Sequence, residues 1–287
     1  MEKNKSICNN AVFYPTMMTI AGSDSIGGAG IQADIKTASA LGVYAMSVIT
    51  AVTAQNTCHV ASYQTISGDL IARQIDTVCE DVMPDAIKTG MIPTADAIHA
   101  IAVAIKKWNI KNIVVDPVAV ATSRDRLSDD SAINAIVSEI FPLADIITPN
   151  VSEASLYTGL TQVQVKSSPA EAARMLLQMG PKYVLIKGGD TPDGDKICDC
   201  LFGFDGSCVD FRHQRINTVN THGTGCSLSS AIASFLALGY SIDNAVSEAE
   251  QFIIRAIYAG SKIKFGNGHG PINHLINLQC EHYKTSK

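Results

Sequence analysis

The segment MMTIAGSDSIGGAGIQADIKTASALG, residues 17–42, gives the first indication of the fold class of this chain. It opens with a short apolar strand over 17–21, which runs into a glycine-rich turn. Apolar residues at helical spacing follow as far as Leu41, and Gly42 suits the C-terminal cap of that helix. The next segment, 43–52, has the pattern of a buried strand, so the region predicts a strand–helix–strand unit.

The same alternation continues toward the C-terminus. Further apolar strands are predicted at 86–88, 113–115, 146–148 and 183–186. Helical patterns lie between them, with the apolar faces Leu70, Ile71, Ile75, Val78 and Val82 after a Ser67 cap, then Ile98, Ile101, Ile105 and Trp108, then Ile133, Ile136, Val137 and Ile140. Near-continuous apolar strands separated by amphipathic helices predict an α/β fold of three layers, with a central, mostly parallel sheet covered by helices on both faces.

Two features interrupt this alternation. Residues 196–212 have the pattern of two strands around Asp205-Gly206, which is a strong hairpin turn. Near the C-terminus two helices are expected in succession, the first over 227–238 and the second through Val246 and Ile257.

Composition narrows the functional class. The chain has 287 residues, of which 46% are hydrophobic and 17% charged, and its net charge is -5. It has no basic stripe, so we expect no nucleic-acid partner. It has no run of 18 apolar residues and no secretory signal, so we expect no membrane association and a cytoplasmic location. Without a Pro- or Ser-rich linker, we predict a single domain over 16–275, with terminal extensions at 1–15 and 276–287.

The eight cysteines include no C-x-x-C pair, and we expect reduced thiols. Cys198, Cys200 and Cys208 lie close enough in sequence to be considered as a metal site. Their segment has the pattern of a hairpin, which favours ordinary strand cysteines instead.

The residues that follow the predicted strands are mostly polar. They are Ser23, Asp24, Gln55, Asn56, Thr89, Gly90, Met91, Asp116, Pro117, Asn150, Glu153 and Lys187. In open parallel sheets, ligands bind outside the carboxyl ends of the strands. The sequence therefore predicts a binding site at one rim of the sheet.

Two glycine-rich loops give different signals. The first, GAGIQA at 28–33, fits the dinucleotide fingerprint, but no acidic residue between Asp34 and Asp69 is available to hold a ribose. A nicotinamide enzyme is therefore disfavoured, and the absence of a G-K-[ST] sequence excludes a P-loop. The second loop, NTHGTGC at 220–226, precedes a predicted helix, whose first N–H groups and dipole could neutralise a phosphoryl group in transfer. The alternative is a tight loop with no ligand.

Nine short motifs follow one another along the chain: TIAGSD (19–24), GGAGIQAD (27–34), AQNT (54–57), KTGM (88–91), DPV (116–118), TPN (148–150), KGG (187–189), THGTGC (221–226) and GHGP (268–271). Together they resemble the ribokinase-like superfamily. The nearest match is its vitamin-kinase branch, the hydroxymethylpyrimidine/phosphomethylpyrimidine kinases of thiamine biosynthesis. The resemblance covers roughly residues 16 to 275.

The resemblance implies a reaction and a set of roles. ATP would phosphorylate the hydroxymethyl group of 4-amino-5-hydroxymethyl-2-methylpyrimidine, and a second ATP would convert the monophosphate to the diphosphate. The implied pyrimidine pocket consists of Asp24, Gln55, Met91 and Val118. Lys187 and Thr221 would meet the ATP phosphates, Gly223 and Gly225 would form the anion hole, Cys226 would take the position of the base, and Asp116 and Glu153 would hold Mg²⁺ through water. The family also implies a homodimer.

Physical chemistry supports these roles and leaves alternatives open. A hydroxymethyl group is a poor nucleophile until its proton is accepted, and a helix N-terminus is expected to lower the pKa of the Cys226 thiol from about 8.5. Cys226 could instead be a packing residue, Asp116 a strand-end cap, and Lys187 a solvated lysine. Glu153 could serve only to start the helix after Asn150. We expect His222 to position its loop.

The chain departs from the family pattern at three positions. Ile26 stands where a small Ser is common, Ala119 replaces the usual Met, and Arg124 stands where the family generally has Gly. With these changes the sequence does not determine the shape of the pocket, but the expected class of reaction is unaffected.

A pyridoxal or pyridoxine kinase of the same branch is the alternative function, and Gln55 discriminates against it because an amide can pair with an aminopyrimidine edge. A non-catalytic pyrimidine-binding sensor is disfavoured by the intact set Asp116, Lys187 and Cys226.

Overall fold

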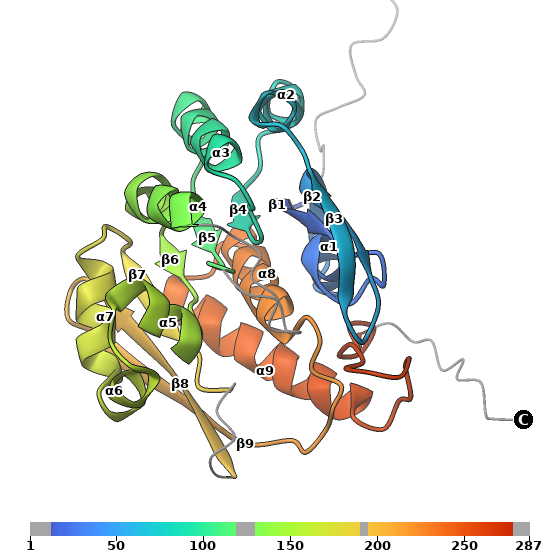
Figure 1. Ribbon diagram of the computed structural model, residues 1–287, viewed down its shortest axis with the longest axis vertical. Coiled ribbons are helices and arrows are strands. Elements are labelled where there is room, and N and C mark those ends of the chain that lie inside the picture. Colours follow the sequence, from blue (N-terminus) through green and yellow to red (C-terminus); the bar gives the residue numbers. More distant parts are fainter. Residues whose placement is uncertain (1–12, 119–129, 190–194, 278–287) are drawn as a thin grey trace, which may run out of the picture.

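The computed structural model describes residues 13–118, 130–189 and 195–277 (Figure 1). Within these ranges nine strands form one sheet in the order β3-β2-β1-β4-β5-β6-β7-β8-β9. The strands are β1 (Thr16–Ser23), β2 (Tyr44–Gln55), β3 (Val60–Thr65), β4 (Ala86–Thr89), β5 (Ile113–Val115), β6 (Ile146–Ile147), β7 (Tyr183–Ile186), β8 (Lys196–Gly203) and β9 (Cys208–Gln214). The six neighbouring strands from β2 to β7 in this order, β1 included, are parallel, whereas β3, β8 and β9 pair antiparallel.

Helices cover both faces of the sheet, as the sequence predicted (Figure 1). One layer contains α2 (Gly68–Cys79), α3 (Ala95–Trp108), α4 (Asp130–Ala135), α5 (Val151–Thr158), α6 (Gln162–Ser167) and α7 (Pro169–Leu177). The other contains α1 (Gly30–Ala40), α8 (Thr224–Ala237) and α9 (Ile242–Gly260). Strand β1 alternates between the two cores: Met18 and Ile20 pack toward the first layer and Met17 toward the second.

Most predicted elements are confirmed, and the hairpin at 196–212 is observed as β8 and β9. Strand β3 was missed because it is an edge strand whose residues are mostly exposed, so it has no apolar pattern. The helix predicted at 227–238 begins earlier, at Thr224, with Gly223 as its N-cap. The predicted helix through 133–140 is α4 followed by a π-helical turn over Ile136–Ile140 and a 3-10 turn over Phe141–Leu143.

The apolar face predicted after Ser67 is partly wrong. The Ser67 side chain caps α2 by accepting from Leu70 N–H, as expected. However, the Leu70 side chain is half exposed, and Val82 lies beyond the end of the helix at Cys79. Ile71 and Ile75 are fully buried and carry the packing of this helix. None of the helices in the described ranges combines the length and apolar character that a membrane-spanning segment needs.

Candidate active site

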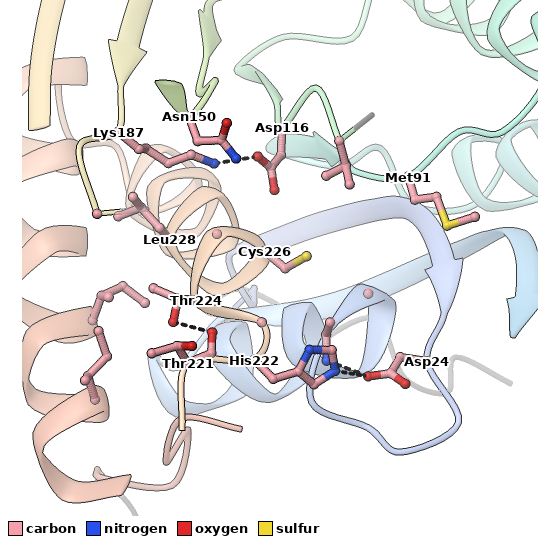
Figure 2. A pocket seen from close by; sticks show the side chains of 18 of the residues that line it. Asp24, Met91, Asp116, Asn150, Lys187, Thr221, His222, Thr224, Cys226 and Leu228 are labelled. Carbon is pink, nitrogen blue, oxygen red and sulfur yellow. Dashed lines mark hydrogen bonds and ion pairs between the residues drawn. The ribbon is translucent and has the colours of Figure 1, made fainter. Parts of the chain in front are cut away.

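A cavity of about 470 Å³ opens at the carboxyl ends of the parallel strands, beside the N-terminus of α8 (Figure 2). All of the residues to which the family resemblance gave a role line this cavity: Asp24, Gln55, Met91, Asp116, Val118, Glu153, Lys187, Thr221, Gly223, Gly225 and Cys226. Of the other residues predicted at the strand ends, Ser23 and Asn150 line it, whereas Asn56, Thr89, Gly90 and Pro117 do not. The residues come from segments far apart in the sequence, and the parallel topology brings them to one rim. Ile26 is described and half-buried, whereas Ala119 and Arg124 lie outside the described residues.

The two glycine-rich loops pack directly against each other. Gly223 has φ +79°, and a Cβ at this position would overlap the carbonyl oxygen of Gly28. A Cβ on Gly28 would in turn overlap the His222 ring. Close contact between the two loops therefore explains the glycine in the GAGIQA stretch at 28–33 that resembles a dinucleotide fingerprint. Through this contact the first loop supports the second.

Asp24 ties these two loops together. Its Oδ2 accepts hydrogen bonds from the N–H groups of Gly28 (3.0 Å) and Ala29 (2.8 Å), and it lies 2.9 Å from His222 Nε2. Burial raises the pKa of Asp24, but the hydrogen bonds with His222 and Ala29 outweigh this effect and lower the pKa below its ordinary value. Asp24 is thus an ionised brace between the loops, and His222 positions its own loop through it.

Gln55 is fixed by its backbone. Its N–H donates to Ser25 Oγ at 2.7 Å, and the Ser25 hydroxyl donates back to the Gln55 carbonyl at 2.8 Å. The Gln55 side-chain amide makes no hydrogen bond to any residue in the described ranges. The Gln55 backbone is therefore fixed, while its side-chain amide is available to form hydrogen bonds at the cavity wall. Recognition of the polar edge of a ring requires this combination.

An ion pair crosses the rim of the cavity. Lys187 Nζ lies 2.9 Å from Asp116 Oδ1, and Thr148 Oγ1 donates to the same oxygen at 3.2 Å. Both contacts use Oδ1, so Asp116 Oδ2 has no partner in the part of the chain that is described. The Lys187 side chain is 12% exposed, so its interpretation as a solvated surface lysine is wrong.

Glu153 starts α5, as one of the two interpretations considered for it expected, and it also faces the cavity. It forms a capping box with Asn150, in which each side chain accepts from the other residue's N–H, at 2.9 and 2.8 Å. It also lines the cavity and is 6% exposed. Asp116 and Glu153 are hard oxygen donors facing one cavity, and this donor set fits Mg²⁺, which prefers carboxylates and water.

Cys226 lies in the first turn of α8, and its Sγ points into the cavity (Figure 2). Burial raises the pKa of its thiol to about 11, and Asp116 and Asp34 add to this rise against the opposing effect of Lys88. The expectation that the helix N-terminus would lower this pKa is therefore wrong. The physical reason is that removing the thiolate from water costs more than the helix dipole returns.

A buried ion pair beneath the cavity escaped the sequence analysis. Lys88 Nζ lies 3.0 and 2.9 Å from the two oxygens of Asp34, and both side chains are fully buried. The hydroxyl groups of Thr19 and Ser230 also donate to Asp34. Burial lowers the pKa of Lys88, but the facing carboxylate raises it by more, so the lysine stays charged. The sequence signal that could have predicted this pair is a lysine inside an apolar strand, because a buried charge needs a partner of opposite charge.

The opposite end of the cavity is mainly apolar. It was missed because its residues belong to β8, the segment after β9, α8 and α9: Ile197, Ile216, Leu228, Ile253 and Ile257. A second pair of buried acids, Asp199 and Glu250, borders it. Burial raises the pKa of both carboxyls, and the neighbouring Asp199 raises that of Glu250 further. Asp199 Oδ1 accepts from Gly188 N–H at 2.7 Å, so this pair supports the loop that carries Lys187.

The N-terminus of α8 supplies anion-binding groups. In the first turn of a helix the N–H groups have no carbonyl four residues earlier to bond, and Gly225 and Cys226 occupy this turn. A Cβ on Gly225 would lie 3.2 Å from Lys187 Nζ, so the glycine keeps the approach to these N–H groups open. Backbone N–H groups, a helix dipole and an ammonium group therefore converge on one point.

Comparison with known proteins identifies the family of this chain. A family model described as phosphomethylpyrimidine kinase matches residues 24–273. A hydroxymethylpyrimidine/phosphomethylpyrimidine kinase of Rhizobium meliloti is 44% identical over 258 residues, covering 90% of this chain and 96% of that protein. A probable chloroplastic thiamine biosynthetic bifunctional enzyme of Oryza sativa is also 44% identical over 95% of this chain, but the chain spans only 50% of that protein's length.

Solved structures show the same relationship. A phosphomethylpyrimidine kinase of Clostridium difficile is 42% identical with a TM-score of 0.73, covering 84% of this chain and 99% of that one. A pyridoxal kinase of Bacillus subtilis, solved as an ADP complex, is 34% identical with a TM-score of 0.83, covering 92% of this chain and 98% of that one. With a family model that matches residues 24–273 and a relative that is 44% identical over nearly its whole length, the chain belongs to the phosphomethylpyrimidine kinase family.

Proposed function

We propose that this chain uses ATP to phosphorylate the hydroxymethyl group of 4-amino-5-hydroxymethyl-2-methylpyrimidine, and then the resulting monophosphate, for thiamine diphosphate biosynthesis. Membership of a kinase family supports the phosphotransferase activity. The observation that carries the proposal is the convergence of the α8 N-terminus and Lys187 on one side of the cavity that Gln55 lines on another.

The cavity offers a place for each reactant. Asp24, Gln55, Met91 and Val118 line one end, where the uncommitted Gln55 amide would pair with the amine and ring nitrogen of the pyrimidine. The apolar end beyond Leu228 suits a nucleobase, and Thr221 and Lys187 lie on the path of its phosphates toward α8. The transferred phosphoryl group would then lie between the two ends, at the first-turn N–H groups of α8.

Phosphoryl transfer depends on positioning and on neutralising charge. The N–H groups of Gly225 and Cys226, the helix dipole and Lys187 would stabilise negative charge at the transfer point. Asp116 and Glu153 would hold Mg²⁺, which supplies further neutralisation of the phosphates when bound. Cys226 as thiolate would accept the hydroxymethyl proton, and its pKa of about 11 makes that form scarce at neutral pH.

The alternative, a pyridoxal kinase, has a specific observation in its favour, namely the high TM-score to the pyridoxal kinase of Bacillus subtilis. Pyridoxal lacks the paired amine and ring nitrogen that Gln55 would recognise. A buried amide left unpaired costs about 1–3 kcal/mol, so discrimination should be measurable.

The deciding experiment compares kcat/KM for hydroxymethylpyrimidine, its monophosphate and pyridoxal with ATP, in wild type and in Gln55→Leu. We expect the wild type to prefer the pyrimidine, and Gln55→Leu to lose roughly tenfold to a hundredfold on the pyrimidine and little on pyridoxal. A wild-type preference for pyridoxal would reverse the proposal. A pyrimidine preference that survives in Gln55→Leu would keep the function and remove Gln55 as its cause.

The homodimer and the cytoplasmic location stay predictions. Sedimentation of the purified chain at several concentrations checks the first.

A further inference from the structure

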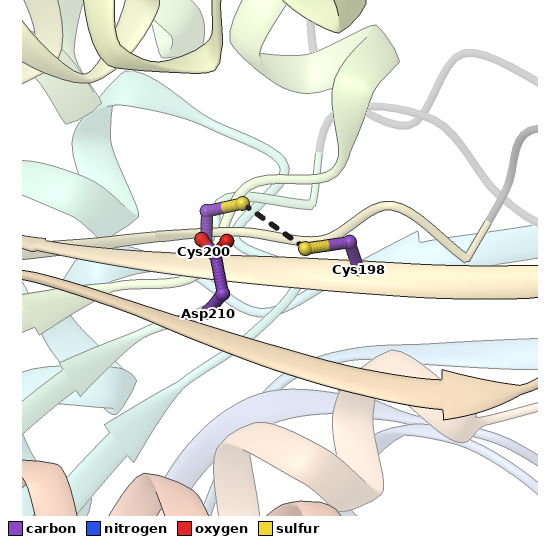
Figure 3. A group of neighbouring side chains, drawn as sticks. All are labelled: Cys198, Cys200 and Asp210. Atoms are coloured by element: carbon purple, nitrogen blue, oxygen red, sulfur yellow. Dashed lines mark hydrogen bonds between the residues drawn. The ribbon is translucent and has the colours of Figure 1, made fainter.

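A group of sulfur and oxygen ligands lies on the β8–β9 hairpin, outside the active-site cavity (Figure 3). In the strand pairing, Cys198 lies opposite Arg212 and Cys200 lies opposite Asp210. Side chains two residues apart on a strand point to the same face, so these four share one face of the hairpin. The alternate residues Ile197, Asp199 and His213 line the active-site cavity on the other face.

The distances in this group match those of a metal site. Cys198 Sγ and Cys200 Sγ are 3.6 Å apart, and these two atoms and a carboxylate oxygen of Asp210 all lie within 4.8 Å of one another. Two Zn–S bonds of about 2.3 Å at the tetrahedral angle place their sulfurs about 3.8 Å apart. The sulfurs are therefore already near the separation that a bound metal ion would impose.

A disulfide fits this geometry less well. A disulfide needs its sulfurs about 2.05 Å apart, with Cα atoms usually about 4.4–6.8 Å apart. Residues two apart on an extended strand have Cα atoms about 6.6 Å apart, near the upper limit of this range. Closing the bond would distort β8, which is paired on both sides, with β7 and with β9. A metal ion can bridge the sulfurs without this distortion.

Arg212 supplies the support that a metal-binding carboxylate needs. Its Nη2 lies 2.7 Å from Asp210 Oδ2, which orients the carboxylate toward the sulfurs. Two thiolates and the carboxylate would carry three negative charges, and a divalent cation together with the guanidinium group would balance them. Cys200 is buried, whereas Asp210 is exposed, so a metal ion here would keep one side open to water.

We propose that Cys198, Cys200 and Asp210 bind a thiophilic divalent cation of the Zn²⁺ class, with water completing a tetrahedral shell. Binding replaces the two S–H protons, which leave to solvent, by two metal–sulfur bonds. Because its ligands come from both β8 and β9, the metal ion cross-links the hairpin. The residues on the opposite face of the same hairpin line the active-site cavity, so the metal ion would stabilise one wall of it.

The test uses the full chain, freshly reduced and freed of metal, titrated with Co²⁺ as a spectroscopic probe and then with Zn²⁺ in competition. We expect one equivalent of Co²⁺ to give a thiolate-to-cobalt charge-transfer band, which one equivalent of Zn²⁺ removes. Zn²⁺ should also raise the midpoint of thermal unfolding. Absence of the charge-transfer band in the wild type would overturn the proposal.

Variants assign the ligands. Cys198→Ser and Cys200→Ser should each weaken Zn²⁺ binding at least tenfold, and Asp210→Asn should weaken it less. Because Cys200 is buried, circular dichroism must show that its variant folds, and Cys198→Ser at the more accessible position keeps the test decisive if it does not. Cys208→Ser, on the same face but outside the group, and Cys226→Ala, in the active site, should both keep the band. A band that survives in the Cys198→Ser, Cys200→Ser double variant, or disappears in either control, would refute this ligand set.

Discussion

Two lysine–aspartate ion pairs lie at the same cavity, and they differ in burial and in how the carboxylate is used. Lys88 and Asp34 are fully buried, the lysine contacts both carboxylate oxygens, and hydroxyl groups of Thr19 and Ser230 donate to the same carboxylate. Lys187 and Asp116 meet at the rim, through a single carboxylate oxygen. The first pair is closed, whereas the second keeps its other carboxylate oxygen available to a ligand.

The difference shows how a charged pair is assigned a role. Residue type does not separate the two pairs, but solvent access and the unused carboxylate oxygen do. A closed pair fixes a charge inside the core and gains nothing from a ligand. An open pair can exchange one of its contacts for a phosphate or a metal ion. We therefore propose a structural role for Lys88 and Asp34, and a role in phosphoryl transfer for Lys187 and Asp116.

Breaking the closed pair should have the largest effect on stability. Lys88→Met leaves the Asp34 carboxylate buried without its counter-charge, which costs about 3–5 kcal/mol of unfolding free energy. Urea unfolding at pH 7 measures the loss. The double variant Lys88→Met, Asp34→Asn should recover much of it, because no uncompensated charge remains. A single variant that loses less than about 1 kcal/mol would contradict the assignment of this pair as structural.

Breaking the open pair should act on turnover more than on folding. Lys187→Ala should lower kcat/KM for ATP by about 100- to 1000-fold, as expected when a group that neutralises transition-state charge is removed. Its unfolding free energy should fall by less than that of Lys88→Met, because water entering from the cavity can solvate Asp116.

Lys182→Ala is the matched control, since Lys182 forms an exposed ion pair with Asp145 beside the other end of β7. It should leave turnover near the wild-type value. Equal loss of activity in the two lysine variants would show that the effect of Lys187 is not local to the site.

Charges of both pairs act on the Cys226 thiol: Lys88 lowers its pKa, whereas Asp116 and Asp34 raise it. If its thiolate accepts the hydroxymethyl proton, the first-step rate should rise with pH toward the thiol pKa of about 11. Cys226→Ala should lose about 100-fold at pH 8 and lose the pH-dependent rise with it. Full activity in Cys226→Ala, with the exposed Cys58→Ala as control, would show that the thiol only packs.

The two buried acids Asp199 and Glu250 complete the comparison and should give the smallest effect on stability. The pKa of Glu250 is raised above its ordinary value of 4.5, so the folded protein holds a proton that the unfolded chain releases. Stability should therefore fall as pH rises from 4.5 toward the raised pKa, by about 1.4 kcal/mol for each pKa unit of the rise.

Glu250→Gln should flatten this decline, whereas the exposed Glu248→Gln on the same helix should leave it unchanged. Urea unfolding at pH 5.5 and pH 8 in both variants provides the measurement. A decline that persists in Glu250→Gln would assign the proton to another group.

Periodicity along the chain was sufficient to predict the class of fold and the rim of the sheet at which polar residues collect. Alternating apolar strands and amphipathic helices are compatible with few arrangements, because each apolar face must be buried. Once the strands are parallel, their carboxyl ends must meet at one rim. This is why Asp24, Gln55, Asp116 and Lys187 could be grouped from their positions along the chain alone. The sequence was also sufficient to disfavour dinucleotide binding by the GAGIQA motif at 28–33, because no acidic residue follows it at the distance needed to hold a ribose.

Which charges pair, and how their protons are held, could be seen only in the folded chain. Lys88 and Asp34 are 54 positions apart, and nothing local in the sequence links them. Strand β3 has no apolar pattern because it lies at an exposed edge. The high pKa of Cys226 depends on burial among residues from several elements, and the approach of Asp210 to two cysteines depends on strand register. Local patterns follow from periodicity along the chain, whereas these properties depend on distances and burial that exist only after the chain has folded.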